Sequence, residues 1–421
     1  MKLAFLVTLI YLYCVFIWGV YVLGRKLSLE EQPWCIDRVS GKVLINKGVE
    51  NVCIDKSTIS FIDGFHSKLY YRGYSIEDLA QNSTYEEVVY LLLYDKLPTK
   101  RELTDFSGWM REERDIPREI DELLCKIPVD VESMEVLRTA VSYLGNLDPG
   151  RYDTSREGMI RKTIRLVAKM PTIIAHWYRI RSNLDVVCPD PRLNHAENFL
   201  YMMFGTKPDQ LSARAMDVSF ILYAEHEMNA SAFTAVVIAS TLSDYYSAIV
   251  GAIGALRGPL HGYANVEAMR QFDEIGTVEN VDKWYEEYIL TGKKRVMGAG
   301  HRVYKTYDPR AKIFREYAKE FAEKYGGRVK TYYQIADRLE GYVMKQLCET
   351  RNICTNCDFW SGIVYYAMGI PVDLYCAVFA AARTVGWSAH VIEYVTENRI
   401  LRPRLYYDGE IEKEYIPVEN R

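Results

Sequence analysis

The stretch from residue 230 to residue 256 constrains the fold more than any other part of this 421-residue chain. It contains one charged side chain, Asp244, and is otherwise rich in alanine, serine, valine and isoleucine. A helix that is apolar on every side is stable only in the centre of a protein or in a contact between subunits, where small residues let backbones approach closely. We therefore expect a central or interfacial helix here.

Helical periodicity extends over most of the chain beyond residue 45. In residues 85–94 apolar side chains cover a broad face, and Thr84 precedes them as the expected N-cap. In residues 310–325 apolar side chains recur every three or four positions among charged ones, which is typical of a solvated helix with one buried stripe. Strand-like alternation is confined to residues 52–62 and 404–407. The pattern predicts an all-α fold.

Charge and cysteine content bear on the classes of partner and site. The 52 basic and 56 acidic residues leave a net charge of −4, which argues against nucleic acid as the main partner. The nine cysteines are scattered and odd in number, which argues against a disulfide framework. Cys354 and Cys357 form a CxxC motif after Cys348, but no second CxxC or nearby histidine supplies the further ligands of a zinc site. We expect no metal there, and any individual disulfide stays open.

Residues 3–24 carry no charge and are followed by Arg25 and Lys26. About 20 apolar residues suffice for a helix to cross a bilayer, whereas the apolar region of a secretory signal is usually about 7–15 residues. The positive-inside tendency would leave the rest of the chain in the cytoplasm, tethered to the membrane. The alternative is a misread start near Val43, since no methionine separates Met1 from Met110. Both interpretations place the body in the cytoplasm.

Three short motifs follow one another in the last part of the chain: GPLHG around His261, GHRVYKTYDPR with His301, and NCDFWSG with Asp358. Each sets one ionisable side chain near glycine or proline, where the backbone turns tightly. Two imidazoles and a carboxylate suit the removal of a proton from carbon and the stabilisation of the resulting enolate. The motifs therefore predict an active site.

Each motif also has a purely structural explanation. Pro259 ends the preceding helix, so His261 is equally suited to capping a buried helix end. His301 heads a basic stretch that either binds phosphates or carboxylates or is simply solvated. Asp358 alone suits an N-cap, although its flanking aromatic residues would desolvate the carboxylate and raise its basicity.

Taken together, these segments resemble the citrate synthase family, which includes 2-methylcitrate synthase, and the archaeal and bacterial short forms are the most similar. The likeness rests on the order, spacing and identity of motifs between residues 46 and 403. In chain order they are NKGVENV from Asn46, YRGY from Tyr71, VLRTA from Val136, HEMNAS from His226, ASTLSD from Ala239, the three motifs above, Ala382-Arg383 and Arg402-Pro403.

The resemblance implies an all-helical homodimer with a two-domain fold, in which a small domain closes over substrates held in a cleft against a large domain. Residues 262–365 would form the small domain, and residues 45–261 with 366–421 the large one. Residues 1–44 lie outside the likeness as an N-terminal apolar extension. The apolar segment 230–256 would lie in the core or the dimer contact, as its composition indicates independently.

The resemblance further implies an acyltransferase that converts the acyl group into alkyl on transfer, condensing acetyl-CoA with oxaloacetate and water to give citrate and CoA. Asp358 would be the base that removes a methyl proton. His261 would donate a hydrogen bond to the thioester oxygen, and His301 would polarise the ketone of oxaloacetate. Neither a metal nor a resident cofactor is expected, because acetyl-CoA is a substrate.

Oxaloacetate brings two carboxylates, which need forked and permanently charged partners. By resemblance these partners are Arg310, Arg383 and Arg402, with assistance from His226. Arg402 would reach in from the other subunit, so the active site would depend on the dimer. Lys305 matches a contact to a phosphate of coenzyme A.

The sequence departs from the usual family pattern without losing a proposed catalytic group. Glu132-Ser133 stands in place of the common His-Pro, and Val236 stands in place of the frequent arginine. Tyr263 replaces the common glycine, Cys357 and Trp360 replace the more usual valine and tyrosine, and Ala382 replaces the common serine. Acyl selectivity therefore stays open, and 2-methylcitrate synthase, which uses propionyl-CoA, is the near rival, since one methylene is worth only about 1–3 kcal/mol. A less favoured alternative is a non-catalytic, membrane-tethered helical scaffold, because a scaffold need not retain all three groups.

Overall fold

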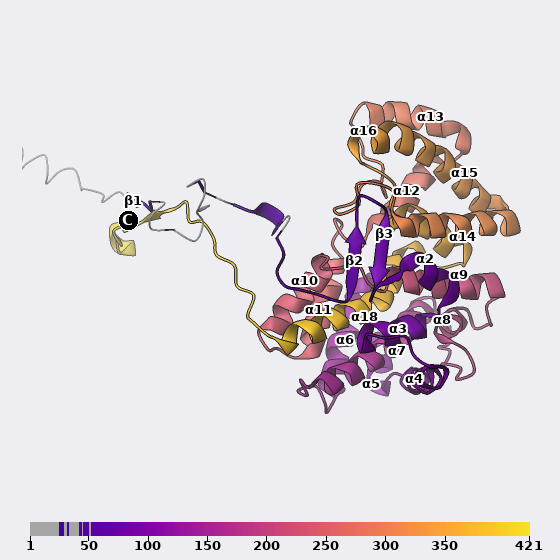
Figure 1. Cartoon of the computed structure of the whole chain (residues 1–421), viewed down its shortest axis with the longest axis horizontal. Coiled ribbons are helices and arrows are strands. Elements are labelled where there is room, and N and C mark those ends of the chain that lie inside the picture. Colours follow the sequence, from indigo (N-terminus) through magenta and orange to yellow (C-terminus); the bar gives the residue numbers. More distant parts are fainter. Residues whose placement is uncertain (1–24, 29–31, 33–41, 44, 50–51) are drawn as a thin grey trace, which may run out of the picture. The chain divides into compact units, whose positions relative to one another are not determined.

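The computed structural model describes residues 25–28, 32, 42–43, 45–49 and 52–421 (Figure 1). The chain divides into two compact units, Met1–Ile54 with Leu401–Arg421, and Asp55–Ile400. The apolar segment 3–24 lies outside the described residues, so the membrane tether and the cytoplasmic location stay predictions. Within the described residues, no helix is both long enough and apolar enough to span a membrane.

The smaller unit contains a two-stranded antiparallel ladder. Its strands are β1, Arg25–Lys26, and β5, Glu410–Ile411. Short 3-10 turns are η2, Lys47–Val49, and η7, Val418–Asn420. The strand expected at residues 404–407 is wrong, because these residues have no regular structure. Alternation favours a strand only where a neighbouring strand is available for pairing, and the pairing partner here lies opposite residues 410–411.

The larger unit begins with a three-stranded antiparallel sheet in the order β2-β3-β4, and the strand predicted near residues 52–62 starts only at Ser60. The remaining elements of this unit are helical, which confirms the all-α prediction. The strands are β2 (Ser60–Asp63), β3 (Lys68–Tyr71) and β4 (Tyr74–Ser75), and the helices are α2 (Ile76–Asn82), α3 (Tyr85–Tyr94), α4 (Lys100–Glu112), α5 (Arg118–Leu124), α6 (Ser133–Leu147), α7 (Arg156–Arg181), α8 (His195–Phe204), α9 (Gln210–Tyr223), α10 (Ala230–Ser240), α11 (Tyr245–Leu256), α12 (Ala264–Ile275), η3 (Val278–Asn280), α13 (Val281–Trp284), η4 (Tyr285–Leu290), α14 (Pro309–Tyr325), α15 (Gly327–Tyr342), η5 (Val343–Cys348), α16 (Glu349–Arg351), α17 (Cys357–Ala367), η6 (Val372–Leu374) and α18 (Tyr375–Thr396).

Helix α18 is the central element of the larger unit. It is buried over nearly its whole length and packs against α7, α9, α10 and α11 (Figure 1). Alanines at 380, 381 and 382 and a glycine at 386 let neighbouring backbones approach it closely. A side chain on α18 is therefore held by packing on several sides.

The apolar stretch 230–256 forms two helices rather than one. Asp244, its single charged residue, caps α11 by accepting a hydrogen bond from the amide of Ser247 (3.0 Å), and this breaks the stretch after α10. Helices α10 and α11 pack against each other and against α18, which agrees with the predicted central position. Their outer sides are only partly covered, and Leu242 between them is 68% exposed.

Local predictions about caps and stripes are confirmed. Thr84 accepts a hydrogen bond from the amide of Glu87 at the start of α3. In α14, Phe314 and Phe321 are buried while the charged residues between them are exposed. The CxxC cysteines do not pair with each other: Cys354 forms a disulfide with Cys348, and Cys357 is a buried free thiol.

The close contact between Gly386 of α18 and residues 224–225 predicts the effect of adding a single methyl group at position 386. A Cβ at Gly386 would lie 2.3 Å from Oε2 of Glu225 and 2.4 Å from the carbonyl of Ala224. Gly386→Ala should therefore lower the free energy of unfolding by about 1–3 kcal/mol. Gly341→Ala on α15, where nothing lies within 4 Å, is the matched control and should raise it by up to about 1 kcal/mol. Urea unfolding followed by circular dichroism measures both, and equal shifts would contradict the packing described here.

Candidate active site

The loop at residues 298–301 is fixed against the segment that precedes α17. The amide of Gly300 donates to the carbonyl of Cys354 (2.8 Å), and the amide of Asn356 donates to the carbonyl of Gly298 (2.9 Å). The side chain of Asn356 also donates to the carbonyl of Gly300 (2.8 Å). These bonds bring the second motif, with His301, to the first turn of the helix that carries the third.

Gly298 is needed for this contact. Its φ is +76°, a backbone region that favours glycine, and a Cβ there would lie 2.7 Å from the Cα of Phe359. A larger residue would push the loop away from α17.

The imidazole of His301 is neutral and its tautomer is fixed by the backbone. Its Nδ1 accepts hydrogen bonds from the amides of Val303 (3.0 Å) and Tyr304 (3.1 Å). Because an amide can only donate, Nδ1 carries no proton, and the proton must sit on Nε2. Burial lowers the pKa of His301 to about 4. The side chain therefore offers a neutral N–H donor at Nε2.

His226 lies beside His301, on the connection between α9 and α10. The two rings are 5.0 Å apart between centroids, and Nε2 of His226 is buried without a hydrogen-bond partner among the described residues. Burial holds the pKa of this imidazole well below its usual value, and the nearby charges of Arg310 and Arg383 lower it further. A buried polar atom without a partner is costly, so it marks a place where a ligand can bind.

His261 has the opposite tautomer. Its Nε2 lies 2.8 Å from Oγ of Ser231 and accepts a hydrogen bond from the amide of the same residue at 3.3 Å. Nε2 therefore carries no proton, which leaves Nδ1 as the N–H donor. Burial, followed by the charge of Arg383, lowers the pKa of His261 to about 4. This residue is a second neutral donor rather than a helix cap.

Asp358 is the second residue of α17, and Asn356 is the N-cap that accepts from its amide (2.9 Å). The hydroxyl of Tyr223 donates to Oδ1 of Asp358 (3.0 Å). Burial raises the pKa of Asp358 to about 6, even though Arg310 and Tyr223 lower it. The carboxyl is thus ionised near pH 7 but considerably more basic than an exposed aspartate, as a general base requires.

Arg383, on α18, is a buried cation. Its Nε donates to the carbonyl of Tyr223 (2.5 Å), and its guanidinium lies over the ring of Phe379, 4.7 Å from the centroid. Within the described part of the chain, no carboxylate lies within 4.0 Å of it. The charge of the buried Glu225 acts on Arg383 without a direct ion pair, so the guanidinium still favours the binding of an anionic ligand.

Arg310, at the start of α14, is buried but already paired. Its Nε and a terminal nitrogen contact the two oxygens of Asp308 at 3.0 and 2.7 Å. The same carboxylate accepts from the amide of Cys357 (3.1 Å), which ties α14 to the beginning of α17. Burial lowers the pKa of Arg310, but the pairing with Asp308 outweighs it and holds the pKa well above its usual value.

Seven of the eight residues predicted from the sequence lie in the larger unit. The charges or rings of all seven act on one another: Arg310, His301, Arg383 and His261 perturb His226, Arg310 and Arg383 perturb Asp358, and Lys305 perturbs His301. Lys305 is partly exposed at the edge of this group, and its amide donates to the carbonyl of Gly64 (2.8 Å) in the turn between β2 and β3. Arg402 belongs to the smaller unit and is exposed within it.

Sequence reasoning missed three residues that hold the others in place. Tyr223 contacts both Asp358 and Arg383, Ser231 fixes the tautomer of His261, and Asp308 pairs with Arg310. Only Asp308 carried a visible signal, because an aspartate directly before a proline is typical of a helix start. Tyr223 lies on the apolar face of its helix and Ser231 is a small polar residue. Their roles depend on which helices pack against each other, which the sequence does not show.

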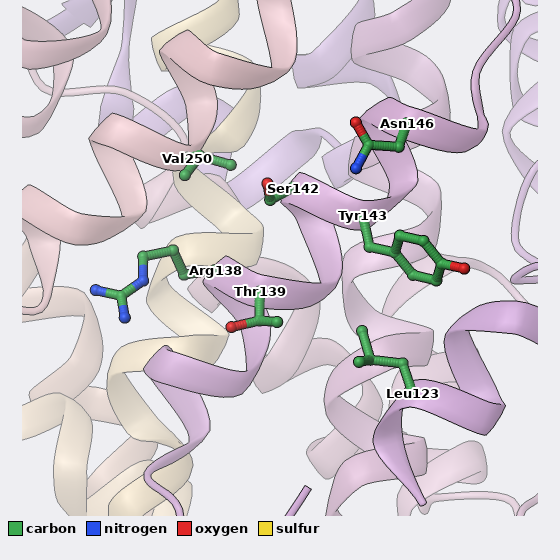
Figure 2. A pocket seen from close by; sticks show the side chains of 7 residues that line it. All are labelled: Leu123, Arg138, Thr139, Ser142, Tyr143, Asn146 and Val250. Carbon is green, nitrogen blue, oxygen red and sulfur yellow. The ribbon is translucent and has the colours of Figure 1, made fainter. Parts of the chain in front are cut away.

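A surface hollow of about 400 Å³ lies elsewhere, between α5, α6 and α11. Figure 2 shows Arg138, Thr139 and Ser142 of α6 along it, with Val250 of α11 on one side and Leu123 of α5 on the other. None of the site residues lines it.

Comparisons with known proteins find similarity to citrate synthases over most of the chain. A sequence model of the citrate synthase C-terminal domain matches residues 48–404. The chain is 42% identical over 379 residues to citrate synthase of Saccharolobus solfataricus, covering 90% of this chain and 100% of that protein. It is 38% identical over 387 residues to 2-methylcitrate synthase of Shewanella oneidensis, covering 90% and 99%. Among solved structures, the ternary complex of carboxymethyl coenzyme A and oxaloacetate with citrate synthase of Thermoplasma acidophilum matches with a TM-score of 0.85 at 39% identity, covering 90% of this chain and 99% of that one.

The tautomers give a prediction that does not depend on activity. In protein labelled with ¹⁵N-histidine, His261 should be protonated only at Nδ1 and His301 only at Nε2, and neither should gain a second proton until the pH falls towards about 4. Nitrogen-detected NMR measures both, with signals assigned by His→Gln variants. The exposed His66 is the control. A midpoint near 6.5 for either site histidine would contradict the burial described here.

Proposed function

Because the chain belongs to the citrate synthase family, we propose that it is an enzyme that condenses acetyl-CoA with oxaloacetate and water to give citrate and CoA. The observation that carries this proposal is that one cluster contains both groups that bind an anion and groups that suit the removal of a proton from carbon. Arg383 makes no ion pair, and Nε2 of His226 has no hydrogen-bond partner among the described residues, so both are suited to an anion. The neutral imidazoles of His261 and His301 and the basic carboxylate of Asp358 lie nearby. Such a set suits a dianionic electrophile and a weak carbon acid.

Oxaloacetate would bind first, through its charge. One carboxylate would take the guanidinium of Arg383 and the free Nε2 of His226, and Arg310 would contribute the nitrogen that Asp308 does not occupy. Nε2–H of His301 would then donate to the ketone oxygen. This hydrogen bond withdraws electron density from the ketone carbon and makes it electrophilic.

Acetyl-CoA would be activated from the other side. The ionised carboxylate of Asp358 removes a proton from the methyl group, and Nδ1–H of His261 donates to the thioester oxygen as negative charge develops there. A neutral imidazole is the better donor for an enolate, because its acidity is closer to that of the enol than the acidity of an imidazolium. The new carbon–carbon bond forms between the methyl carbon and the ketone carbon. Water then hydrolyses the citryl thioester, which releases CoA.

Lys305 would hold a phosphate of coenzyme A at the edge of the site, where its partly exposed ammonium lies next to His301 in the same loop. Side chains of this protein would carry out the proton removal, the polarisation of the ketone and the stabilisation of the enolate. Acetyl-CoA takes part as a substrate rather than as a resident cofactor.

We also propose that the enzyme works as a homodimer. The outer sides of α10 and α11 are apolar and only partly covered, with Phe233, Val237, Ile238 and Val250 half-buried. A second copy would bury this face. By the family resemblance, Arg402 would then reach the active site of the other subunit. Residues 262–365 would move as the small domain against residues 45–261 and 366–421, and closure would exclude water during enolisation.

The substrate assay tests the proposal directly. Purified protein should release CoA from acetyl-CoA only when oxaloacetate is present, and kcat/KM for acetyl-CoA should exceed that for propionyl-CoA by about tenfold or more, since one methylene is worth that much in a fitted pocket. A ratio near one or below would favour 2-methylcitrate synthase, the name of one relative. A well-folded protein that releases no CoA from either substrate would favour the scaffold.

The role of Asp358 gives a second test. Asp358→Asn keeps the shape but removes the base, so kcat should fall by about 10²- to 10⁴-fold. Because burial raises the pKa of this carboxyl to about 6, lowering the pH protonates the base, and wild-type kcat should decrease about tenfold between pH 7 and pH 5. Asp337→Asn on the exposed side of α15 is the control and should leave kcat unchanged. Near-normal turnover of Asp358→Asn would overturn the assignment.

A further inference from the structure

The loop that carries His261 is bracketed by two residues that contact the same carboxylate. Arg257, at the C-terminal end of α11, donates to Oε2 of Glu132 from a terminal nitrogen (2.7 Å) and from Nε (3.1 Å). Tyr263, at the start of α12, donates through its hydroxyl to Oε1 of Glu132. Glu132 itself precedes the first residue of α6. Both ends of the loop are therefore attached to one point on another helix.

Leu256 and Gly262 at the ends of the loop are buried, whereas Pro259 and Leu260 at its tip are exposed. Within the loop, the amide of His261 donates to the carbonyl of Gly258 (2.9 Å), and the amide of Gly262 donates to the carbonyl of Leu256 (2.9 Å). These bonds define the turn but do not fix its place in the molecule. Leu260, next to His261, is fully exposed and packs against nothing. The polar contacts that hold this loop are therefore those of Glu132 with Arg257 and Tyr263, of Glu135 with Arg257, and of Ser231 with His261.

By the family resemblance, glycine is expected at the position of Tyr263 and histidine at that of Glu132, so two of the three residues in this contact depart from the expected pattern. A glycine has no side chain with which to reach α6. The two departures touch each other, so they form one feature of this chain rather than two separate substitutions.

We propose that Glu132 is a positioning residue, which holds the 257–263 loop through Tyr263 and Arg257 so that Nδ1–H of His261 faces the thioester oxygen. The inference rests on the proposed function, because it concerns the orientation of a group that acts on acetyl-CoA. Glu132 does not touch a substrate; it acts through its two neighbours. In the proposed domain division Tyr263 is the second residue of the small domain, so the contact also spans the boundary at residue 262.

Three variants test this role. Tyr263→Phe removes only the hydroxyl donor, and Glu132→Gln removes the charge while retaining the shape. Glu135→Gln is the matched control, since Glu135 also pairs with Arg257 (2.9 Å) but does not contact Tyr263. Tyr263→Phe and Glu132→Gln should each lower kcat roughly tenfold or more, because small misplacements of a catalytic group cost this much. The KM for oxaloacetate should change less than about twofold, and the double variant should lose no more than the worse single one, since both remove one contact.

Hydrogen exchange measured by mass spectrometry gives a readout that does not depend on turnover. In Tyr263→Phe, the peptide that covers residues 256–264 should exchange faster than in the wild type, while peptides from α6 and α18 should not change. Glu135→Gln should leave both kcat and this exchange at the wild-type values.

Several outcomes would overturn the proposal. One is an unchanged kcat in Tyr263→Phe and Glu132→Gln with a lowered melting temperature, which would show a merely structural contact. Another is an equal loss in Glu135→Gln, which would assign the effect to Arg257 alone. Wild-type protein that releases no CoA would overturn the proposed function instead. In that case, faster exchange of residues 256–264 in Tyr263→Phe would still support the attachment of the loop to Glu132. Unchanged exchange in this variant would overturn that attachment.

Discussion

Tyr223 joins the two halves of the site, and the rest of the arrangement depends on it. Its backbone carbonyl accepts from the buried guanidinium of Arg383, and its hydroxyl donates to the carboxylate of Asp358. The residue is the last of α9, and it is fully buried against α18 and α14. A cation and a base that would otherwise attract each other are thus kept apart, each with one neutral partner. Direct pairing would lower the basicity of Asp358 and occupy the cation needed for the anionic substrate.

The two neutral histidines show a second constraint, which is imposed by backbone amides. In His301 the acceptor is Nδ1 and in His261 it is Nε2, so the free N–H groups are on different ring atoms. Burial and the nearby arginines disfavour a second proton on either ring. The site therefore contains two fixed donors that need no proton transfer before they act. Preorganised donors of this kind stabilise a developing oxyanion more than mobile groups in water do.

Much of this could be predicted from the sequence, because periodicity and capping are local. The helical pattern, the N-cap at Thr84 and the buried stripe of α14 follow from residue order alone. Asp244 is a residue type that commonly caps helices, but the apolar residues on both sides of it favoured a single continuous helix. What could not be predicted is which helices meet. The disulfide between Cys348 and Cys354, the contacts of Tyr223 and the tautomers of the histidines all depend on tertiary packing.

The most direct test of the account is a crystal structure of the protein with oxaloacetate and a non-reactive acetyl-CoA analogue bound near pH 7. The account predicts one carboxylate of oxaloacetate on Arg383 and His226, its ketone oxygen within hydrogen-bond distance of Nε2 of His301, and the analogue between His261 and Asp358. A complex in which Arg383 binds no carboxylate, or in which the ketone faces away from His301, would contradict it.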